Sequence, residues 1–235
     1  VAYPDFLPAA ERLASFRRTH DALQVKVVTP QQIYNEFSSG IPDVAAIRDY
    51  VKMYYDRAGI NTNLMPRYLL LFGDASFDYK DIEFKAGNNH NFVPTYESTE
   101  SLNAVETYCT DDFFGLLDDD EGQNINLTNQ FLDIAIGRIP ITTADEAEKV
   151  VDKIMHYDNS STLGEWRNNI TFIADDEDGN LHLDDAQIHV TNVEENNPVY
   201  NIDKIYLDAY PQISTAGGSL YPDVNTAINN KIFSG

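Results

Sequence analysis

The stretch RYLLLFGDASFDYK, residues 67 to 80, decides how this chain folds. It contains five large apolar residues in succession, Tyr68 to Phe72, which stop at Gly73 and are too few for an isolated helix. Such a run is typical of a central parallel strand that is buried on both faces. Ligands of open α/β sheets bind beyond the carboxyl ends of the strands. The polar residues that follow the run are therefore candidates for a functional edge: Asp74, Ser76 and Asp78.

The rest of the sequence alternates between helix and strand patterns around this run. Apolar residues at helical spacing predict helices over residues 4–18, 30–37, 42–58, 143–157 and 183–194, and from residue 222 onward. β-branched or alternating segments predict strands over residues 23–30, 92–98, 132–140, 169–174 and 199–207. Thr143 and Glu146 have the spacing of a capping box. The alternation predicts an α/β fold of parallel-rich sheets with flanking helices.

A compositional break predicts where the chain divides. The segment DNSSTLGEW, residues 158–166, is polar and contains glycine, so we expect one subdomain over residues 1–160 and a second over residues 161–235. Only three residues precede the first predicted helix, and no strand follows the last one. A doubly wound sheet does not begin or end in this way, so we expect a part of a longer domain whose second subdomain is incomplete.

Composition limits the partners. The sequence has 38 Asp and Glu against 16 Lys and Arg, a formal net charge of -22, which repels nucleic acids and anionic membranes. A single cysteine allows neither an internal disulfide nor a cysteine-rich zinc site. No apolar run approaches the length of a transmembrane segment. The single glycine of FGDAS is not a glycine-rich phosphate fingerprint, which disfavours a flavodoxin-like nucleotide binder.

Two acidic segments, residues 111–120 and 175–185, suggest a calcium site, because Ca²⁺ binds hard oxygen ligands. An EF-hand is rejected, since placing Gly179 at the sixth loop position puts the first ligand on Ala174. An irregular site remains a hypothesis; the alternatives are a solvated acidic surface, hydrogen-bonded turns, and carboxylates that favour a helix N-terminus. The candidate ligands are Asp74, Asp78, Asp111, Asp112 and Asp176.

The only thiol, Cys109, is predicted not to be a nucleophile. It lies in TYCTDD, where neighbouring carboxylates raise the pKa of a thiol and oppose formation of the thiolate. The five histidines have no paired metal-ligand spacing. His182, which precedes a helix beside several carboxylates, is the histidine with a candidate role in a site.

Six segments carry a family resemblance: YPDFLPAAERLASFRR, LQVKVVTPQQIYNEFSSGIPDVAAIRDYVKMYYDRA, RYLLLFGDASFDYK, YCTDDFFGLLDDDEG, LDIAIGRIPITTADEAEKVVDKIMHYD and FIADDEDGNLHLDDA. In this order they resemble the peptidase domain of the gingipain family of cysteine peptidases, family C25, and within it the sortase-type members of the type IX secretion system. The resemblance implies a caspase-like fold of two adjoining sheet subdomains and calcium as a structural ion. It also implies a location at the cell surface, associated with the outer membrane, or secreted.

The resemblance also implies that the catalytic groups lie elsewhere. In that family the catalytic histidine follows a helix resembling AINNKIFSG, residues 227–235, and the nucleophilic cysteine comes later still. The acids that support the histidine correspond to Glu177 and to Asp184 or Asp185. The expected function is that of a cysteine endopeptidase or sortase-type transpeptidase acting on secreted cargo with C-terminal signal domains. We expect these 235 residues alone to be inactive. The alternative is a non-catalytic, calcium-stabilised surface binding module.

Overall fold

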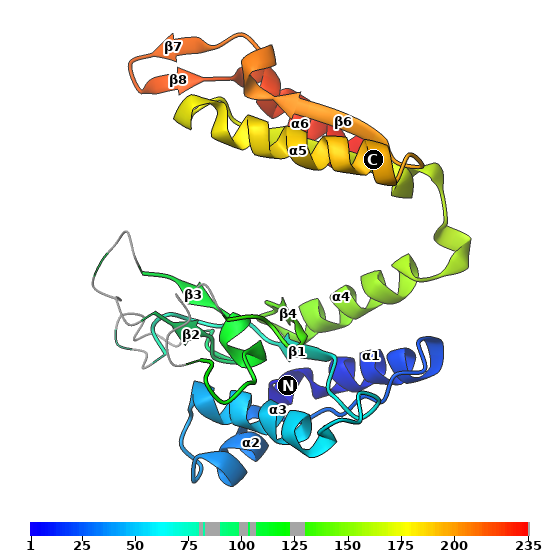
Figure 1. The fold of residues 1–235 in the computed structure, drawn as a ribbon, viewed down its shortest axis with the longest axis vertical. Coiled ribbons are helices and arrows are strands. Elements are labelled where there is room, and N and C mark those ends of the chain that lie inside the picture. Colours follow the sequence, from blue (N-terminus) through cyan, green and yellow to red (C-terminus); the bar gives the residue numbers. More distant parts are fainter. Residues whose placement is uncertain (80–81, 83–89, 99–102, 104–106, 123–129, 235) are drawn as a thin grey trace. The chain divides into compact units, whose positions relative to one another are not determined.

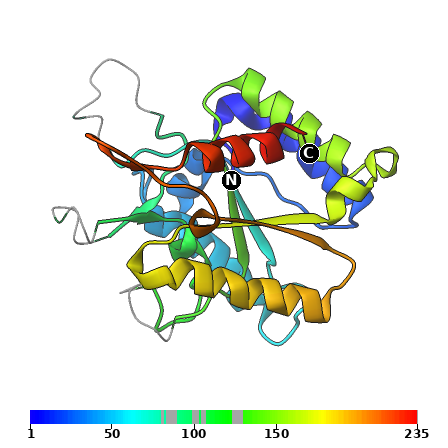
Figure 2. The ribbon, with the colours of Figure 1, turned by 90° about the horizontal axis from the view of Figure 1, so that it is seen from above.

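A computed structural model describes residues 1–79, 82, 90–98, 103, 107–122 and 130–234 of the chain (Figures 1 and 2). The chain divides into two compact units, Val1–Asp158 and Asn159–Gly235. Each contains a pair of parallel strands with flanking helices, so the predicted α/β class is confirmed.

The first unit is built around β1 (Tyr68–Phe72), which pairs in parallel with β4 (Ala135–Ile139). On its other edge Phe72 forms a parallel bridge with Ala2, so β1 is the central strand. A short antiparallel pair, β2 (Tyr96–Glu97) and β3 (Cys109–Thr110), follows in the chain. The helices of this unit are α1 (Leu7–His20), α2 (Pro30–Phe37), α3 (Val44–Ala58) and α4 (Ala144–Tyr157).

Local signals in the sequence fix where these helices begin. Thr143 caps α4, since its side chain accepts a hydrogen bond from the Glu146 backbone N–H at 3.2 Å and Glu146 accepts one from Thr143 N–H at 3.2 Å. This reciprocal arrangement is the predicted capping box. Thr29 and Gln32 form a second one at the start of α2. Each box satisfies backbone donors that a helix N-terminus otherwise leaves unpaired.

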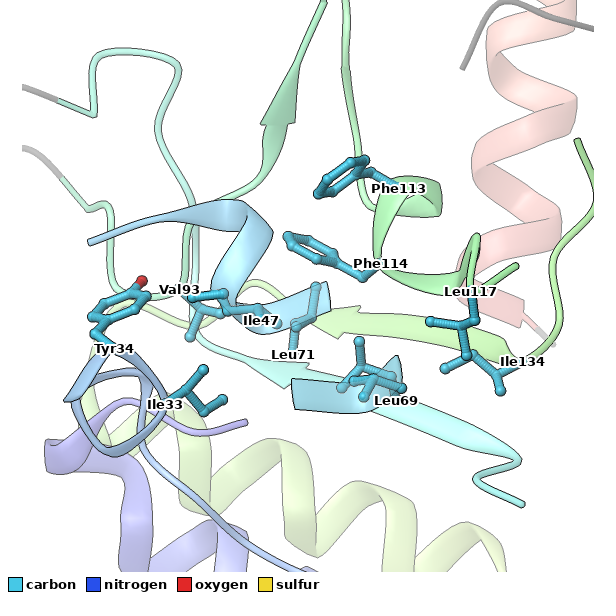
Figure 3. Close-up of a cluster of buried hydrophobic side chains, with 12 residues drawn as sticks. Ile33, Tyr34, Ile47, Leu69, Leu71, Val93, Phe113, Phe114, Leu117 and Ile134 are labelled. Atoms are coloured by element: carbon cyan, nitrogen blue, oxygen red, sulfur yellow. The ribbon is translucent and has the colours of Figure 1, made fainter. Parts of the chain in front are cut away.

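Two hydrophobic clusters lie on opposite faces of the β1–β4 pair. Figure 3 shows the first, in which Leu69 and Leu71 of β1 lie among side chains from α2, α3 and the segment around Phe113 and Phe114. The second joins Phe72 to side chains of α1 and α4. The helices therefore sandwich the carboxyl half of β1.

The prediction that β1 is buried on both faces is wrong for its first half. Tyr68 is 67% exposed and Leu70 is 37% exposed, while Leu71 is fully buried. The reason lies in the register: Tyr68 pairs with Ala135, whose side chain is a single methyl group, and Leu70 pairs with Gly137, which has no side chain to cover it. The second cluster reaches only the carboxyl half of the strand.

The strand predicted over residues 23–30 is also wrong. Residues 22–29 adopt no regular structure, and α2 already begins at Pro30. Ala2 N–H donates a hydrogen bond to Val28 C=O at 2.9 Å, and Leu23 N–H donates one to Arg17 C=O at 3.3 Å, but these contacts do not form a ladder. β-branched residues favour a strand only where a partner strand continues the ladder.

The second unit begins with a β-α-β element. β5 (Asn169–Ala174) pairs in parallel with β6 (Asn201–Tyr206), and α5 (Leu181–Asn196) connects them, as predicted. An antiparallel hairpin of β7 (Ile213–Thr215) and β8 (Gly218–Leu220) follows, and then α6 (Pro222–Ser234). The sequence analysis did not predict the hairpin, because its serine and glycine residues give no alternating apolar pattern.

Candidate functional site

Polar groups at the carboxyl end of β1 and β4 meet around Arg138. Its Nε and Nη2 donate hydrogen bonds to the two carboxylate oxygens of Asp111 at 2.8 and 2.7 Å. Its Nη1 donates to the carbonyl oxygens of Gly73 and Val93 at 2.8 and 2.7 Å, and Nη2 also donates to Pro94 C=O at 3.1 Å. All five N–H groups of the guanidinium are therefore satisfied. Arg138 joins three separate segments of the first unit at this edge.

Asp111 and Asp112, two of the predicted calcium ligands, follow β3 directly. Both oxygens of Asp111 bind Arg138, and one also accepts a hydrogen bond from Thr95 Oγ1 at 3.0 Å. Asp112 is exposed and begins a 3-10 helix over Asp112–Gly115. The Asp111 carboxylate is thus engaged in holding the edge together.

Asp74 and Asp78, which follow β1, take part in hydrogen-bonded turns. Asp74 accepts a hydrogen bond from Ala75 N–H at 2.9 Å, and Asp78 accepts one from Ile82 N–H at 2.9 Å. Asp78 is buried, with 7% of its surface exposed. The pKa of Glu97 is raised, first by burial and then by the negative charge of Asp78. These contacts agree with hydrogen-bonded turns, which are the alternative to a calcium site for these aspartates.

Side chains of α3 bind the acidic segment between Asp118 and Glu121. Lys52 Nζ donates a hydrogen bond to Leu117 C=O at 2.6 Å and lies 2.9 Å from a carboxylate oxygen of Asp119. The pKa of Lys52 is raised, chiefly by its hydrogen bond to Asp119. Tyr55 Oη lies 3.1 Å from a carboxylate oxygen of Asp118. Much of this acidic segment therefore has a structural role.

Within either unit, the described residues do not bring the predicted calcium ligands together in a cluster. In the part of the chain that the structure describes, no three histidine, cysteine, aspartate or glutamate side chains lie close enough to hold a metal ion. The candidates fall at three places: after β1 (Asp74, Asp78), after β3 (Asp111, Asp112) and, in the second unit, after β5 (Asp176). Calcium stays a prediction from the family resemblance.

In the second unit, an acidic turn follows the carboxyl end of β5. Asp176 accepts a hydrogen bond from Tyr221 Oη at 2.5 Å, and Tyr221 Oη accepts one from Gln212 Nε2 at 2.9 Å. The pKa of Tyr221 is raised, first by its hydrogen bond to Asp176. Within the described residues, Oδ1 of Asp175 and Oη of Tyr206 are buried and have no hydrogen-bond partner. Polar groups are thus concentrated at this edge.

The acids predicted to support a catalytic histidine lie around the same turn. Glu177 precedes a left-handed turn, in which Asp178, Gly179 and Asn180 have φ of 51°, 69° and 69°. Asp184 and Asp185 lie in the first turns of α5, and all three acids are exposed. His182 Nε2 lies 3.9 Å from a carboxylate oxygen of Asp178. These acids thus lie in the turn after β5 and at the start of α5. Their catalytic role stays a prediction.

Cys109 lies in β3 and is exposed. Its pKa is raised, as the sequence predicts, but the largest cause is partial burial of the thiol, and the negative charges of Glu97 and Asp111 come second. A catalytic cysteine needs the opposite, a lowered pKa and a neighbouring cation or imidazole.

Three residues of these edges were missed by the sequence analysis: Arg138, Gln212 and Tyr221. Arg138 and Tyr221 act through partners far away in the sequence, Asp111 at 27 positions and Asp176 at 45, while Gln212 binds Tyr221 nine positions away. Only Arg138 gave a local signal, since a charged side chain within an apolar strand requires buried partners.

The model of peptidase family C25 matches residues 1–235. The chain therefore belongs to peptidase family C25, a family of cysteine peptidases. It is similar to the crystal structure of dimeric latent PorU from Porphyromonas gingivalis, with a TM-score of 0.61 and 36% sequence identity. The match covers 71% of this chain and 16% of the PorU chain, so it spans a small part of that protein. A search of curated proteins found no match. Among the described residues, no helix is long and apolar enough to cross a membrane.

Proposed function

We propose that the chain is the first part of the catalytic domain of a cell-surface cysteine peptidase that acts on secreted proteins. The observation that carries this proposal is the match to family C25 along the whole chain. In the proposal, residues 1–160 form the first subdomain and residues 161–235 form the front half of the catalytic subdomain. The nucleophilic cysteine and the catalytic histidine come from sequence outside these 235 residues.

The proposed reaction is acyl transfer. A histidine-assisted thiolate attacks a peptide carbonyl, backbone N–H groups stabilise the oxyanion, and an acyl-enzyme forms as the amine leaves. Water then completes proteolysis, or an amine completes a sortase-type transpeptidation. In the sortase case the substrate is a secreted cargo protein with a C-terminal signal domain, and an amine-bearing surface polysaccharide accepts the acyl group.

The role proposed for this chain is to support that chemistry. Glu177 and Asp184 or Asp185 would accept a hydrogen bond from the catalytic imidazole, fix its orientation and stabilise its protonated form. Their location around the turn after β5 supports this role, because it lies at the carboxyl end of a parallel strand. The first unit would supply a rigid scaffold through Arg138.

The test compares two proteins in a peptide-cleavage assay. One is the 235-residue chain; the other extends it until it includes the histidine and the cysteine of the family. We expect the longer protein to cleave a cargo-derived peptide and the 235 residues to show no turnover. Cys109→Ala should leave the activity of the longer protein within about twofold, because this thiol is not the nucleophile. Cleavage by the 235 residues that disappears in Cys109→Ala would contradict the proposal.

A further inference from the structure

The hairpin of β7 and β8 is a feature of the second unit to which the proposed function gives no role. Its strands pair at Ile213–Leu220, Ser214–Ser219 and Thr215–Gly218. Figures 1 and 2 both show it projecting beyond α5 and α6. Every residue over 211–220 is exposed, and in the described part of the chain neither strand pairs with a third one. Backbone N–H and C=O groups on both outer edges are therefore open to solvent.

The sequence of this hairpin carries no charge. Residues 209–222 contain no Asp, Glu, Lys or Arg, and no other uncharged run in the sequence is as long. Natural proteins usually protect exposed strand edges with charged side chains, bulges or proline. Nothing of this kind lies within β7 or β8. Both edges are thus able to accept another strand.

The hairpin is fixed at its base and at its tip. Gln212, which precedes β7, donates a hydrogen bond to Tyr221, which follows β8, and Tyr221 donates one to Asp176 after β5. At the tip, Thr215 Oγ1 donates to Gly218 C=O at 2.7 Å. A hairpin held in this way loses little conformational freedom when it binds a partner.

We propose that this hairpin binds an extended polypeptide segment by strand addition, with the segment pairing along β7 or β8. Ile213 and Leu220 lie opposite each other and are 51% and 52% exposed, so they offer an apolar contact to side chains of an added strand. Asp208 and Asp223 flank the hairpin in the sequence, Asp176 binds Tyr221 at its base, and the net charge is -22, so the segment lacks acidic side chains. This inference rests on the proposed function: the segment is a stretch of the protein substrate, and it is held at the carboxyl end of β5.

The size of the hairpin favours a peptide over a second copy of this chain. Each strand has three residues, whereas stable protein interfaces bury about 1,200–2,000 Å² in total. A three-residue edge provides only a few backbone hydrogen bonds, which corresponds to a dissociation constant on the order of 1 mM. Weak, reversible binding suits a substrate that must enter and leave.

The test is a titration of the ¹⁵N-labelled 235-residue chain with an end-capped peptide of eight alternating threonine and valine residues, followed by NMR. We expect dose-dependent shifts of the backbone amides of Ser214, Ser219 and their neighbours. A peptide of the same sequence with every backbone nitrogen methylated has no donors for strand pairing on either edge and should not bind.

Two double variants test whether the peptide binds at the edges of β7 and β8. Ser214→Lys with Ser219→Glu places a charge on each edge, while the two opposite charges still favour pairing within the hairpin. We expect binding to weaken about tenfold in this variant. Ser214→Thr with Ser219→Thr adds no charge and should bind as the unmodified chain does.

Shifts confined to other residues, or equal binding of the methylated peptide, would overturn the inference. Shifts of the hairpin amides with protein concentration alone would overturn it too, because they would indicate self-association. An absence of any shift would overturn it as well. The titration measures binding without turnover. Its failure leaves the peptidase proposal intact, and a failed peptidase assay leaves a positive titration intact.

Discussion

Arg138 carries a positive charge into a largely buried position, where its side chain is 13% exposed. The five hydrogen bonds and the paired Asp111 charge compensate for the loss of water. A lysine has all its donors on one atom and cannot reach acceptors on both sides of a planar fork. The structure therefore predicts that this position requires arginine.

We expect Arg138→Lys to lower the free energy of unfolding by about 3 kcal/mol, because it leaves a partly buried carboxylate and several carbonyl groups incompletely paired. Urea unfolding of the 235-residue chain measures this change. The control is Arg18→Lys, since Arg18 and Glu11 form a pair whose side chains are 41% and 55% exposed. That substitution should cost about 0–1 kcal/mol. Equal midpoints for the two variants would contradict the role given to Arg138.

Tyr34 gives the first unit a dependence on alkaline pH. Burial, and then the negative charge of Asp43, raise the pKa of Tyr34 to about 12. In the unfolded chain the pKa of tyrosine is about 10. Since the folded value is the higher one, this contribution to stability is fully present below pH 10 and is lost as the pH rises through about 12.

We therefore expect the unmodified chain to lose up to about 2–3 kcal/mol more stability than Tyr34→Phe when the pH rises from 9 to 12. Urea midpoints measured at several pH values give this difference. Tyr68→Phe serves as the control, because Tyr68 is 67% exposed in the same unit. If Tyr34→Phe and Tyr68→Phe show the same pH dependence, burial of the Tyr34 hydroxyl is not the cause.

For single residues, the sequence predicts those contacts whose partners are close neighbours in the chain. Thr143 and Glu146 are three positions apart, and their capping box was predictable for that reason. Asp111 was predicted as a calcium ligand, but its partner Arg138 lies 27 positions away. No periodicity or short motif reveals a contact of that kind.

Elements with a strong local signal follow the predictions closely. The bounds of α2, β1 and β5 agree with the predicted ones residue by residue. Thr29 and Pro30 mark the start of α2, Gly73 follows the end of β1, and a short, largely apolar run forms each of the two strands. The strand predicted over residues 23–30 failed because its neighbour Ala2 gives it a single backbone hydrogen bond, to Val28 C=O, rather than a ladder. Strand formation depends on a partner that the local sequence does not contain.

The alternation of exposure along β1 gives a prediction for this element. We expect Leu71→Ala to lower the free energy of unfolding by about 3 kcal/mol, because Leu71 is fully buried in the cluster of Figure 3. Leu70→Ala in the same strand should cost about 1 kcal/mol or less, since Leu70 is 37% exposed. Urea unfolding of both variants measures the difference. Similar losses would show that the first half of β1 is covered in solution.

For the molecule as a whole, the alternation of strands and helices was enough to predict the α/β class. It was not enough to predict chemistry, because a fold of this class supports many reactions. The family became predictable only from several ordered segments, and the match to family C25 over residues 1–235 agrees with it. The acidic segments suggested calcium, yet Arg138, Lys52 and Tyr55 already bind several of those acids.

The central claim is that this chain belongs to a cysteine peptidase whose nucleophile is not Cys109. The most direct test treats the longer protein, which includes the cysteine of the family, with a peptidyl epoxide and identifies the alkylated cysteine by mass spectrometry. We predict a label on a cysteine outside these 235 residues, blocked by competing substrate, and no substrate-sensitive label on Cys109. Substrate-sensitive labelling of Cys109 that parallels the loss of peptidase activity would contradict the claim.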